Sequence, residues 1–167
     1  PLSGDLAALG LGIKNSVDLA IKQANDSKTI PGWTIEIAAE DDEAKPDVGK
    51  NAATKLVADK DVVGVVGTLN SSVAQSVQPV LASAKITQVS PANTGTSLTQ
   101  GADPAAPKRT YPTYFRTCTT DSIQGPFAAR YLFTNAGIKK VATIHDKKTY
   151  GQGLVAAFTK EFTKLGG

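Results

Sequence analysis

Three small polar residues, Asn70, Ser71 and Ser72, follow the apolar run at residues 62–66 and precede a segment with helical spacing. This order predicts that they lie at the carboxyl end of a strand and the amino end of a helix. The first N–H groups of a helix have no partner within it and carry a partial positive charge. The position is therefore suited to bind an anionic group such as a carboxylate.

Two other interpretations of these residues can be weighed from the sequence. The pattern G-x-x-x-x-G-K-[ST] is not found there, which argues against a nucleotide-binding P-loop. The serine hydroxyls could instead accept hydrogen bonds from the amides of the first helical turn and simply cap the helix. Capping and ligand binding both remain open at this point.

Catalytic and metal-binding chemistry find little support. His145 stands beside Asp146, but the sequence has no G-x-S-x-G motif and no second histidine to complete a catalytic set. The acidic run at residues 40–43 has no histidine or further carboxylate cluster near it, which favours an exposed loop over a metal site. We expect no enzyme activity, no cofactor and no metal. Loss of a measured turnover on changing Ser71 or His145 would favour an enzyme instead.

Apolar segments alternate along the chain with segments of helical spacing. Strands are predicted at residues 33–39, with Trp33 in the core, at 62–66, where the strand is buried, and at 86–90, 114–117 and 141–145. Helices are predicted around residues 13–24, after Pro46, after Ser71, at 122–133 with Phe127, Tyr131 and Leu132 as apolar candidates, and at 153–165. This alternation predicts βαβ units, a parallel sheet and an α/β fold, with ligands outside the carboxyl ends of the strands.

Composition narrows the class of protein. The chain has 167 residues, of which 41% are hydrophobic and 20% charged, a length that suits one domain or parts of two. No apolar run approaches the roughly 18 residues of a membrane span. The net charge is only +3, and lysines and arginines are scattered beside acids, which argues against nucleic-acid binding. Cys118 is the single cysteine, so no intrachain disulfide is expected.

The two ends of the sequence suggest a piece of a longer chain. Residues 1–4 have the composition of a loop that follows a strand, and residues 166–167 that of a helix stop before another strand. We therefore expect that a partner completes the fold, either the remaining part of the same protein or a second copy of this chain.

Seven motifs in order resemble one known family. They are P-L-S-G-D-L-A-A-L-G at 1–10, E-D-D-E-A-K-P at 40–46, G-T-L-N-S-S at 67–72, S-P-A-N-T at 90–94, F-R-T at 115–117, D-S-I-Q-G at 121–125 and H-D-K-K-T-Y-G-Q-G at 145–153. Together they resemble the periplasmic branched-chain amino-acid binding proteins of ABC transporters, the type I, Leu/Ile/Val-binding-like fold. The resemblance implies three αβα layers, a mostly parallel sheet and two lobes that close on ligand. It also implies that residues 1–118 form lobe one, without its first strand, and that residues 119–167 begin lobe two.

The resemblance also implies a ligand site. Ser71 matches the serine that holds the carboxylate of the amino acid, and Ala92 matches a backbone carbonyl that contacts its ammonium group. Thr94 matches the threonine that touches both charged groups, and Tyr150 matches a tyrosine of lobe two that closes over the ligand. The acidic anchor of the ammonium group would lie beyond Gly167. From the residues alone, Thr94 could serve only turn chemistry, and Tyr150 could be plain surface.

Two positions depart from the well-known members. Leu9 stands where an aromatic residue flanks the ligand, and Asn70 stands, with Ala44, where some members have a cysteine pair. By resemblance, Leu9 and Asn70 line the part of the pocket that receives the ligand side chain. Leucine, isoleucine and valine are therefore not the only candidates, and other amino acids, amides and small carboxylates remain open.

The function implied is that of an extracytoplasmic receptor, periplasmic and either free or lipid-anchored. It would capture an amino acid or similar small carboxylate and deliver it to the membrane permease of an ABC transporter. The alternative is a ligand-sensing domain of a receptor or transcriptional regulator on the same fold, since a fold does not fix a function. A DNA-binding helix-turn-helix before Pro1 would favour the regulator, and a signal peptide would favour the transport receptor.

Overall fold

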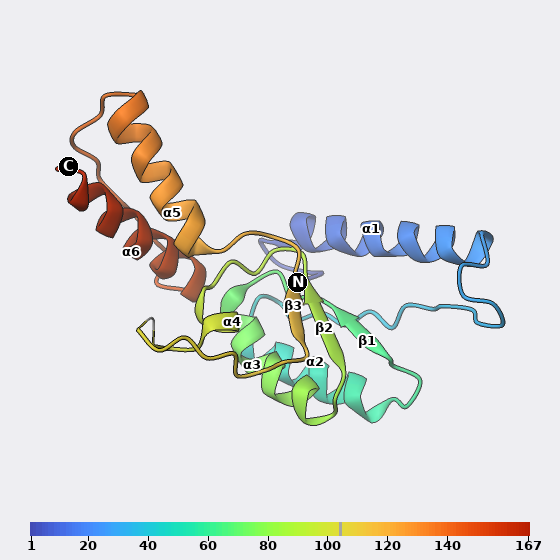
Figure 1. The fold of residues 1–167 in the computed structure, drawn as a ribbon. Coiled ribbons are helices and arrows are strands. Elements are labelled where there is room, and N and C mark those ends of the chain that lie inside the picture. The colour runs from blue at the N-terminus through green and yellow to red at the C-terminus, as the bar shows by residue number, and fades with distance from the viewer. Residues whose placement is uncertain (104) are drawn as a thin grey trace.

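The computed structural model describes residues 1–103 and 105–167, which form a small parallel sheet with helices around it (Figure 1). In chain order the elements are α1 (Ala7–Asp26), α2 (Pro46–Ala58), β1 (Gly64–Val66), α3 (Ser71–Ser83), β2 (Thr87–Ser90), α4 (Ser97–Gln100), β3 (Tyr114–Arg116), α5 (Asp121–Arg130), the π-helical turn η1 (Tyr131–Asn135) and α6 (Thr149–Lys164).

The sheet of the described residues has three parallel strands in the order β1-β2-β3. Val65 pairs with Gln88 on β2, and Val89 pairs with Phe115 on β3. Helix α3 connects β1 to β2, so these elements form the predicted βαβ unit. Figure 1 shows α1 above the sheet and α2 and α3 below it. The predicted α/β fold with a parallel sheet between helices is confirmed.

The core lies around α3, which packs between α2 and the sheet. One buried cluster joins Ala53 of α2 to Val73, Val77 and Leu81 of α3. A second joins Ala74 on another side of α3 to Leu98 and Tyr114. Because both clusters share α3, the helix and the loop that precedes it are fixed from two sides.

Two of the five predicted strands are not strands in the described residues. The segment at 33–39 is extended but has no neighbouring strand; instead, the backbone of Ile35 exchanges two hydrogen bonds with the side chain of Asn25 on α1. Residues 141–145 are also irregular, and Ile144 is 94% exposed. Trp33, predicted in the core, is 70% exposed, so that prediction is wrong. Alternation shows which side chains could face inward, but a strand also needs an adjacent backbone to bond with.

Strand β1 is shorter and more exposed than its apolar sequence predicts. It covers three residues; Val66 within it is 53% exposed, and Val63 just before it is 83% exposed. It pairs only with β2 among the described residues, so it lies at the edge of the sheet. The prediction of a wholly buried strand is therefore wrong in its burial, while the position of the strand is confirmed.

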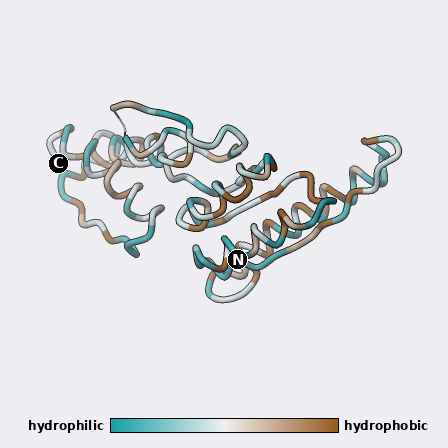
Figure 2. Tube along the Cα trace, turned by 90° about the horizontal axis from the view of Figure 1, so that it is seen from below, coloured by the Kyte–Doolittle hydropathy of each residue, from teal (hydrophilic) through white to brown (hydrophobic). Residues whose placement is uncertain are grey.

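Helix α1 is longer than predicted and amphipathic along its length. Ile13, Val17 and Ile21 are partly buried, whereas Leu9 and Leu19 are exposed. Figure 2 shows hydrophobic and hydrophilic residues alternating along this helix, which begins near the N-terminus. The helix predicted around residues 13–24 is confirmed.

Helices α5 and α6 form a pair that projects from the sheet (Figure 1). A Cβ at Gly125 would lie 2.7 Å from the backbone nitrogen of Phe158, so the missing side chain allows the two backbones to approach closely. Phe158 stacks on Phe162 at 5.3 Å between ring centroids, and Arg130 forms an ion pair with Glu161 at 2.7 Å. Both helices were predicted, although the segment at 122–133 divides into α5 and the π-helical turn.

The apolar candidates of α5 are not buried as predicted. Phe127 and Tyr131 are 67% and 56% exposed, and only Leu132 is partly buried. The helix meets its partner through the small residues Gly125 and Ala129 instead. Close helix packing selects small side chains at the contact, which leaves the large ones on the outer face.

Candidate functional site

The amino end of α3 has no side-chain cap. Asn70 is the N-cap residue, with an extended backbone at φ −88° and ψ 132°, but its side chain makes no capping hydrogen bond. Ala74 donates to the carbonyl of Asn70, which closes the first turn. The amides of the preceding positions have no acceptor within the helix, so they can donate to an anion.

The side chain of Ser71 links α3 to the loop after β2. Ser71 is 1% exposed, and its Oγ accepts a hydrogen bond of 3.1 Å from the backbone nitrogen of Gly95. Among the described residues this hydroxyl donates to no acceptor, so its proton is available to a ligand. A Cβ at Gly95 would lie 3.1 Å from the Cβ of Ser71, so the glycine allows this close approach. The simple capping interpretation of Ser71 is therefore wrong.

Ser90, the last residue of β2, shapes the loop that contains Ala92. Its Oγ accepts hydrogen bonds from the backbone nitrogens of Ala92 at 3.2 Å and Asn93 at 2.9 Å. The same hydroxyl donates to the carbonyl of Thr68 at 2.8 Å. Ser90 thus fixes the turn and attaches it to the loop after β1.

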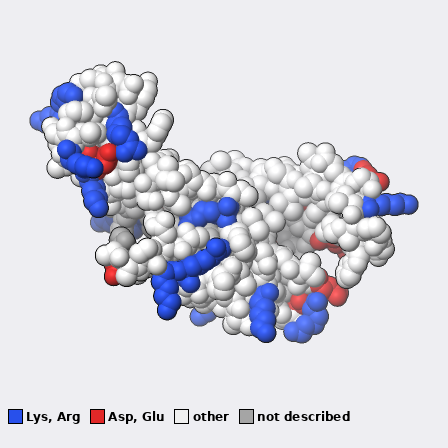
Figure 3. Space-filling view, viewed as in Figure 1, with Lys and Arg blue, Asp and Glu red and all other residues white. Residues whose placement is uncertain are grey.

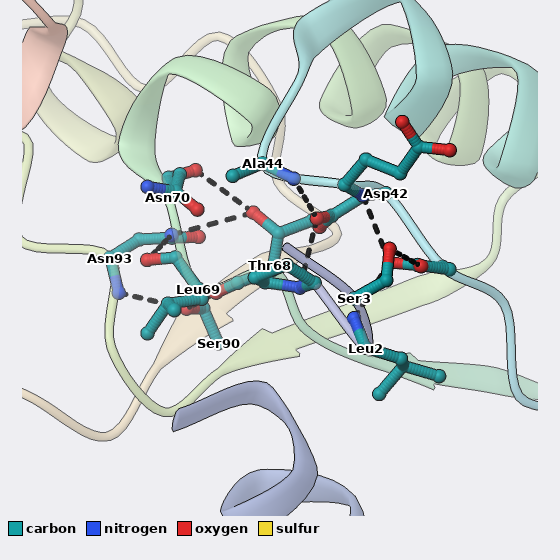
Figure 4. Close-up of polar contacts among 12 residues, drawn as sticks. Leu2, Ser3, Asp42, Ala44, Thr68, Leu69, Asn70, Ser90 and Asn93 are labelled. Atoms are coloured by element: carbon teal, nitrogen blue, oxygen red, sulfur yellow. Dashed lines mark hydrogen bonds and ion pairs between the residues drawn. The ribbon is translucent and has the colours of Figure 1, made fainter. Parts of the chain in front are cut away.

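Asn93 joins the two loops through its side chain (Figure 4). It is fully buried; its Nδ2 donates to the carbonyl of Leu69 at 2.9 Å, and its Oδ1 accepts from the hydroxyl of Tyr114 at 3.1 Å. Burial raises the pKa of Tyr114 to about 12, which keeps this phenol protonated as a donor. Asn93, in the loop after β2, therefore connects the loop after β1 to the first residue of β3. Sequence analysis missed this role, and its one signal was an amide among the small residues of S-P-A-N-T.

Arg116 holds the backbone on both sides of Thr94. Its Nη1 donates to the carbonyls of Asn93 at 2.8 Å and Gly95 at 2.9 Å. Its Nη2 donates to the hydroxyl of Thr99 at 2.6 Å. A guanidinium has five donors in a fixed plane, so these bonds restrict the loop strongly. Sequence analysis quoted Arg116 within a motif but gave it no role.

The acidic loop at residues 40–43 has a structural role. Asp41 accepts from the backbone nitrogens of Leu2 at 2.6 Å and Glu43 at 2.9 Å, and from the hydroxyl of Ser3. The bond from Ser3 is the largest cause that lowers the pKa of Asp41 to about 2. Figure 4 shows this loop beside Leu2 and Ser3. It is partly buried rather than fully exposed, and no group of three metal-ligating side chains exists within residues 1–103 and 105–167.

The structure brings four of the six predicted site residues together. Asn70 and Ser71 follow β1, Ala92 and Thr94 follow β2, and the bonds of Ser90 and Asn93 hold the two loops in contact. The Oδ1 of Asn70 and the Oγ1 of Thr94 are buried, with no hydrogen-bond partner in the described chain. Buried polar atoms usually have hydrogen-bond partners, so these two oxygens are available to bind a further group.

The other two predicted site residues are exposed and lie on the helices α1 and α6. Leu9 is on the first turn of α1 and is 59% exposed, and Tyr150 is on the first turn of α6 and is 44% exposed. The hydroxyl of Thr149, next to Tyr150, lies 3.2 Å from Oε1 of Gln75 on α3, to which it donates. Two surface hollows, one lined by Val141 and Phe158 and one by Val57 and Ile86, include none of the six residues.

His145 and Asp146 form a turn before α6. The Nδ1 of His145 accepts from the backbone nitrogen of Lys147 at 3.0 Å, and a carboxylate oxygen of Asp146 accepts from that of Lys148 at 3.0 Å. These bonds agree with the structural interpretation of this pair.

Comparison with known proteins identifies the family. Residues 1–167 match the family described as periplasmic binding protein.

The chain belongs to the periplasmic binding proteins.

The periplasmic binding proteins similar to this chain include a curated relative and solved structures. The chain is 36% identical over 166 residues to Leu/Ile/Val-binding protein homolog 3 of Brucella melitensis, covering 99% of this chain and 43% of that protein. A leucine binding protein LivK from Thermotoga maritima superimposes with a TM-score of 0.87 at 27% identity, over 100% of this chain and 45% of that one. The sequence here thus spans less than half the length of these relatives.

A further similar structure carries a different ligand. It is the solute binding protein of an ABC transporter from Rhodopseudomonas palustris BisB5 in complex with 3,4-dihydroxy benzoic acid. The TM-score is 0.84 at 29% identity, over 100% of this chain and 43% of that chain. The predicted family and fold are confirmed. The ligand-contact roles given to individual residues stay predictions.

Proposed function

We propose that the complete protein that carries this chain is an extracytoplasmic solute receptor of an ABC transporter, which captures an amino acid or a similar small carboxylate. The observation that carries this proposal is the uncapped amino end of α3, where the buried hydroxyl of Ser71 meets the loop after β2. The names of similar proteins supply the class of ligand. Leucine and 3,4-dihydroxy benzoic acid share one feature, a carboxylate.

The carboxylate would bind at the first turn of α3. Its oxygens would accept from the free amides of that turn and from the hydroxyl of Ser71. The carbonyl of Ala92 and the side chain of Thr94 would face the ammonium group of an amino acid. Each charge-assisted hydrogen bond of this kind contributes about 1.5–3 kcal/mol. The bonds of Ser90, Asn93 and Arg116 support the proposal because they hold both loops in place before ligand arrives.

Closure of two lobes would complete the site. We infer that residues 1–118 belong to lobe one, that residues 119–167 begin lobe two, and that Tyr150 closes over the bound ligand. The contact between Thr149 and Gln75 supports this, since it brings the amino end of α6 against α3. A ligand would shift the balance between open and closed states only by its greater affinity for the closed state.

The family also supports a location and partners. The receptor would act outside the cytoplasm, free or lipid-anchored, and would deliver its ligand to a membrane permease. The helices of the described residues include none with the length and hydropathy of a membrane span. Figure 3 presents lysines and arginines as groups separated by uncharged surface, which favours a small-molecule partner over nucleic acid. Capture of this kind needs no cofactor and no covalent chemistry.

A ligand panel tests the proposal. The complete protein is titrated by calorimetry with leucine, isoleucine, valine, benzoate and 3,4-dihydroxybenzoate, and with leucinamide as the control without a carboxylate. We expect binding of at least one acid and no binding of leucinamide. Asn70→Ala should change the rank order of the acids, because Asn70 would face the ligand side chain. Leucinamide binding as tightly as leucine would contradict the proposal.

A further inference from the structure

The residues before α1 are folded against the first turn of this helix. A Cβ at Gly10 would lie 1.5 Å from the carbonyl oxygen of Pro1, so only a glycine allows this oxygen to lie directly on the helix. Both Pro1 and Gly10 are buried. Residues 1–10, which include Leu9, therefore form one compact unit, the amino-terminal unit.

Helix α1 is attached to the rest of the chain by polar side chains near its two ends. Among residues 1–103 and 105–167 it makes no extensive contact with another helix or strand. At its far end, Asn25 exchanges two hydrogen bonds with the backbone of Ile35. Just before its near end, Asp41 accepts from the amide of Leu2 at 2.6 Å and from the hydroxyl of Ser3. The amino-terminal unit is thus joined to the acidic loop through Asp41.

An ion pair at Pro1 does not replace this attachment. The amino group of Pro1 lies 2.9 Å from a carboxylate oxygen of Asp42. Inside a longer chain, a proline nitrogen is an uncharged amide without a proton and could form no such pair. The hydrogen bonds of Asp41 are therefore the attachment that is kept whatever precedes Pro1.

The acidic loop is fixed in turn to the first half of α3. A Cβ at Gly49 of α2 would lie 2.4 Å from Cγ1 of Val73 and 3.4 Å from the Cβ of Asp42, so these side chains meet at the glycine. Val73 is fully buried and lies two residues after Ser71. The acidic loop therefore joins the amino-terminal unit to the helix end at which a carboxylate would bind.

We propose that Asp41 is a positioning residue for ligand selectivity: it holds the amino-terminal unit on the acidic loop and so fixes Leu9 as one wall of the ligand site. Leu9 is 59% exposed on the first turn of α1, so its side chain is accessible to a ligand. With its carboxylate at Ser71, the ligand would direct its side chain toward Leu9. The inference rests on the proposed function, because it takes the amino end of α3 as the carboxylate site.

The carboxylate of Asp41 is suited to this role. It accepts from three separate donors, since the amide of Glu43 also donates to it at 2.9 Å. An ionised carboxylate has acceptor sites for all three, and its charge makes each hydrogen bond stronger than one between neutral groups. The amino-terminal unit and the acidic loop are therefore held in one arrangement.

A fixed wall selects ligands by the shape of their side chains. One methylene more or less in a fixed apolar pocket changes recognition by about 10- to 200-fold. When a wall can move, the pocket adapts to side chains of different size and discriminates less. The carboxylate contacts at Ser71 do not involve Asp41. Loss of Asp41 should therefore lower selectivity more than it lowers the affinity common to all ligands.

The test is calorimetry of the complete protein with glycine, alanine, valine, leucine and phenylalanine, and with benzoate and 3,4-dihydroxybenzoate. The measured quantity is the affinity ratio of the best to the second-best probe within the series that binds. Asp41→Ala should lower this ratio by roughly threefold to tenfold. Asp59→Ala is the matched control and should leave it unchanged, because Asp59 also accepts from the amide two residues later, that of Asp61 at 2.9 Å, but is exposed and accepts from no distant donor in the described residues.

A double-mutant cycle separates positioning from stability. In a Leu9→Ala background, Asp41→Ala should leave the affinity ratio unchanged, because the side chain that it positions is gone. Ser3→Ala removes one of the two long-range hydrogen bonds at an exposed position and should lower the ratio in the same direction. This variant serves as the test if Asp41→Ala does not fold.

The outcomes distinguish this inference from the proposed function. If Asp41→Ala weakens all bound probes equally, or lowers the ratio as much in the Leu9→Ala background, Asp41 has only a structural role. The inference is then overturned while the proposed function stands. An unchanged ratio in both Asp41→Ala and Ser3→Ala overturns it in the same way. A parent protein that binds none of the probes counts against both.

Discussion

The loops of the sheet and the α5–α6 pair are stabilised in different ways. Asn93 and Ser90 bond to groups on neighbouring loops, and both are buried. In the helical pair, by contrast, Ile123 and Phe127 are 61% and 67% exposed, and the two helices approach closely at Gly125. The predicted ligand loops therefore have a fixed form of their own, whereas the outer face of the helical pair contributes little to its stability.

The first prediction is that truncating an apolar residue of the core lowers the stability of the fold much more than truncating one on the outer face of α5. Leu81→Ala should destabilise the chain by about 2–5 kcal/mol, because Leu81 is 1% exposed in the cluster between α2 and α3. Phe127→Ala should change stability by no more than about 0.5 kcal/mol, since its side chain faces solvent. Urea unfolding followed by circular dichroism measures both. An equal loss in the two variants would show that α5 is covered on its outer face.

The second prediction separates loop positioning from stability. Asn93→Ala should cost about 1–3 kcal/mol, because it leaves the hydroxyl of Tyr114 and the carbonyl of Leu69 without partners, and it should also weaken ligand binding. Asn25→Ala is the matched control: it removes two hydrogen bonds to Ile35, far along the chain from the ligand loops.

Both asparagine variants should therefore lose stability, but only Asn93→Ala should lose affinity. Thermal unfolding and calorimetry on the complete protein measure the two effects. If Asn25→Ala weakens binding as much as Asn93→Ala does, the loss of affinity follows general destabilisation and Asn93 has no specific role.

The third and smallest effect concerns the acidic loop. The pKa of Asp41 is lowered to about 2 in the folded chain, so its charged form is favoured by folding. Its contribution is fully present above pH 4 and is lost as the pH falls from about 4 to 2. Asp41→Asn should therefore flatten the fall in stability within this window, while Asp61→Asn, at an exposed position, should not. Identical pH profiles for the two variants would contradict this role.

The sequence predicted the elements whose partners lie close in the chain. The βαβ unit of β1, α3 and β2 follows from its apolar spacing, and its sheet is parallel as expected. The strand predicted at residues 33–39 failed because the alternating pattern does not specify a partner, and this segment bonds to the side chain of Asn25 instead. Strand formation is decided by tertiary context more than by propensity.

The candidate site was predicted in part. The anion site at Ser71 was predicted from its position between a strand and a helix, whereas the role of Thr94 came from a resemblance. The geometry brings their loops together. The supporting roles of Asn93 and Arg116 could not be predicted, because their hydrogen bonds to Leu69 and to Asn93, respectively, join residues more than twenty positions apart.

The measurement that tests the account most directly is calorimetry of Ser71→Ala in the complete protein, with Ser83→Ala on the exposed end of α3 as the control. The account places the ligand carboxylate at the amino end of α3, where Ser71 donates to it. The expected result is a tenfold to hundredfold weaker affinity for the best acid of the panel, about 1.5–3 kcal/mol, with the control unchanged. If Ser71→Ala binds that acid as tightly as the parent, the carboxylate is not held at α3 and the assigned site is wrong.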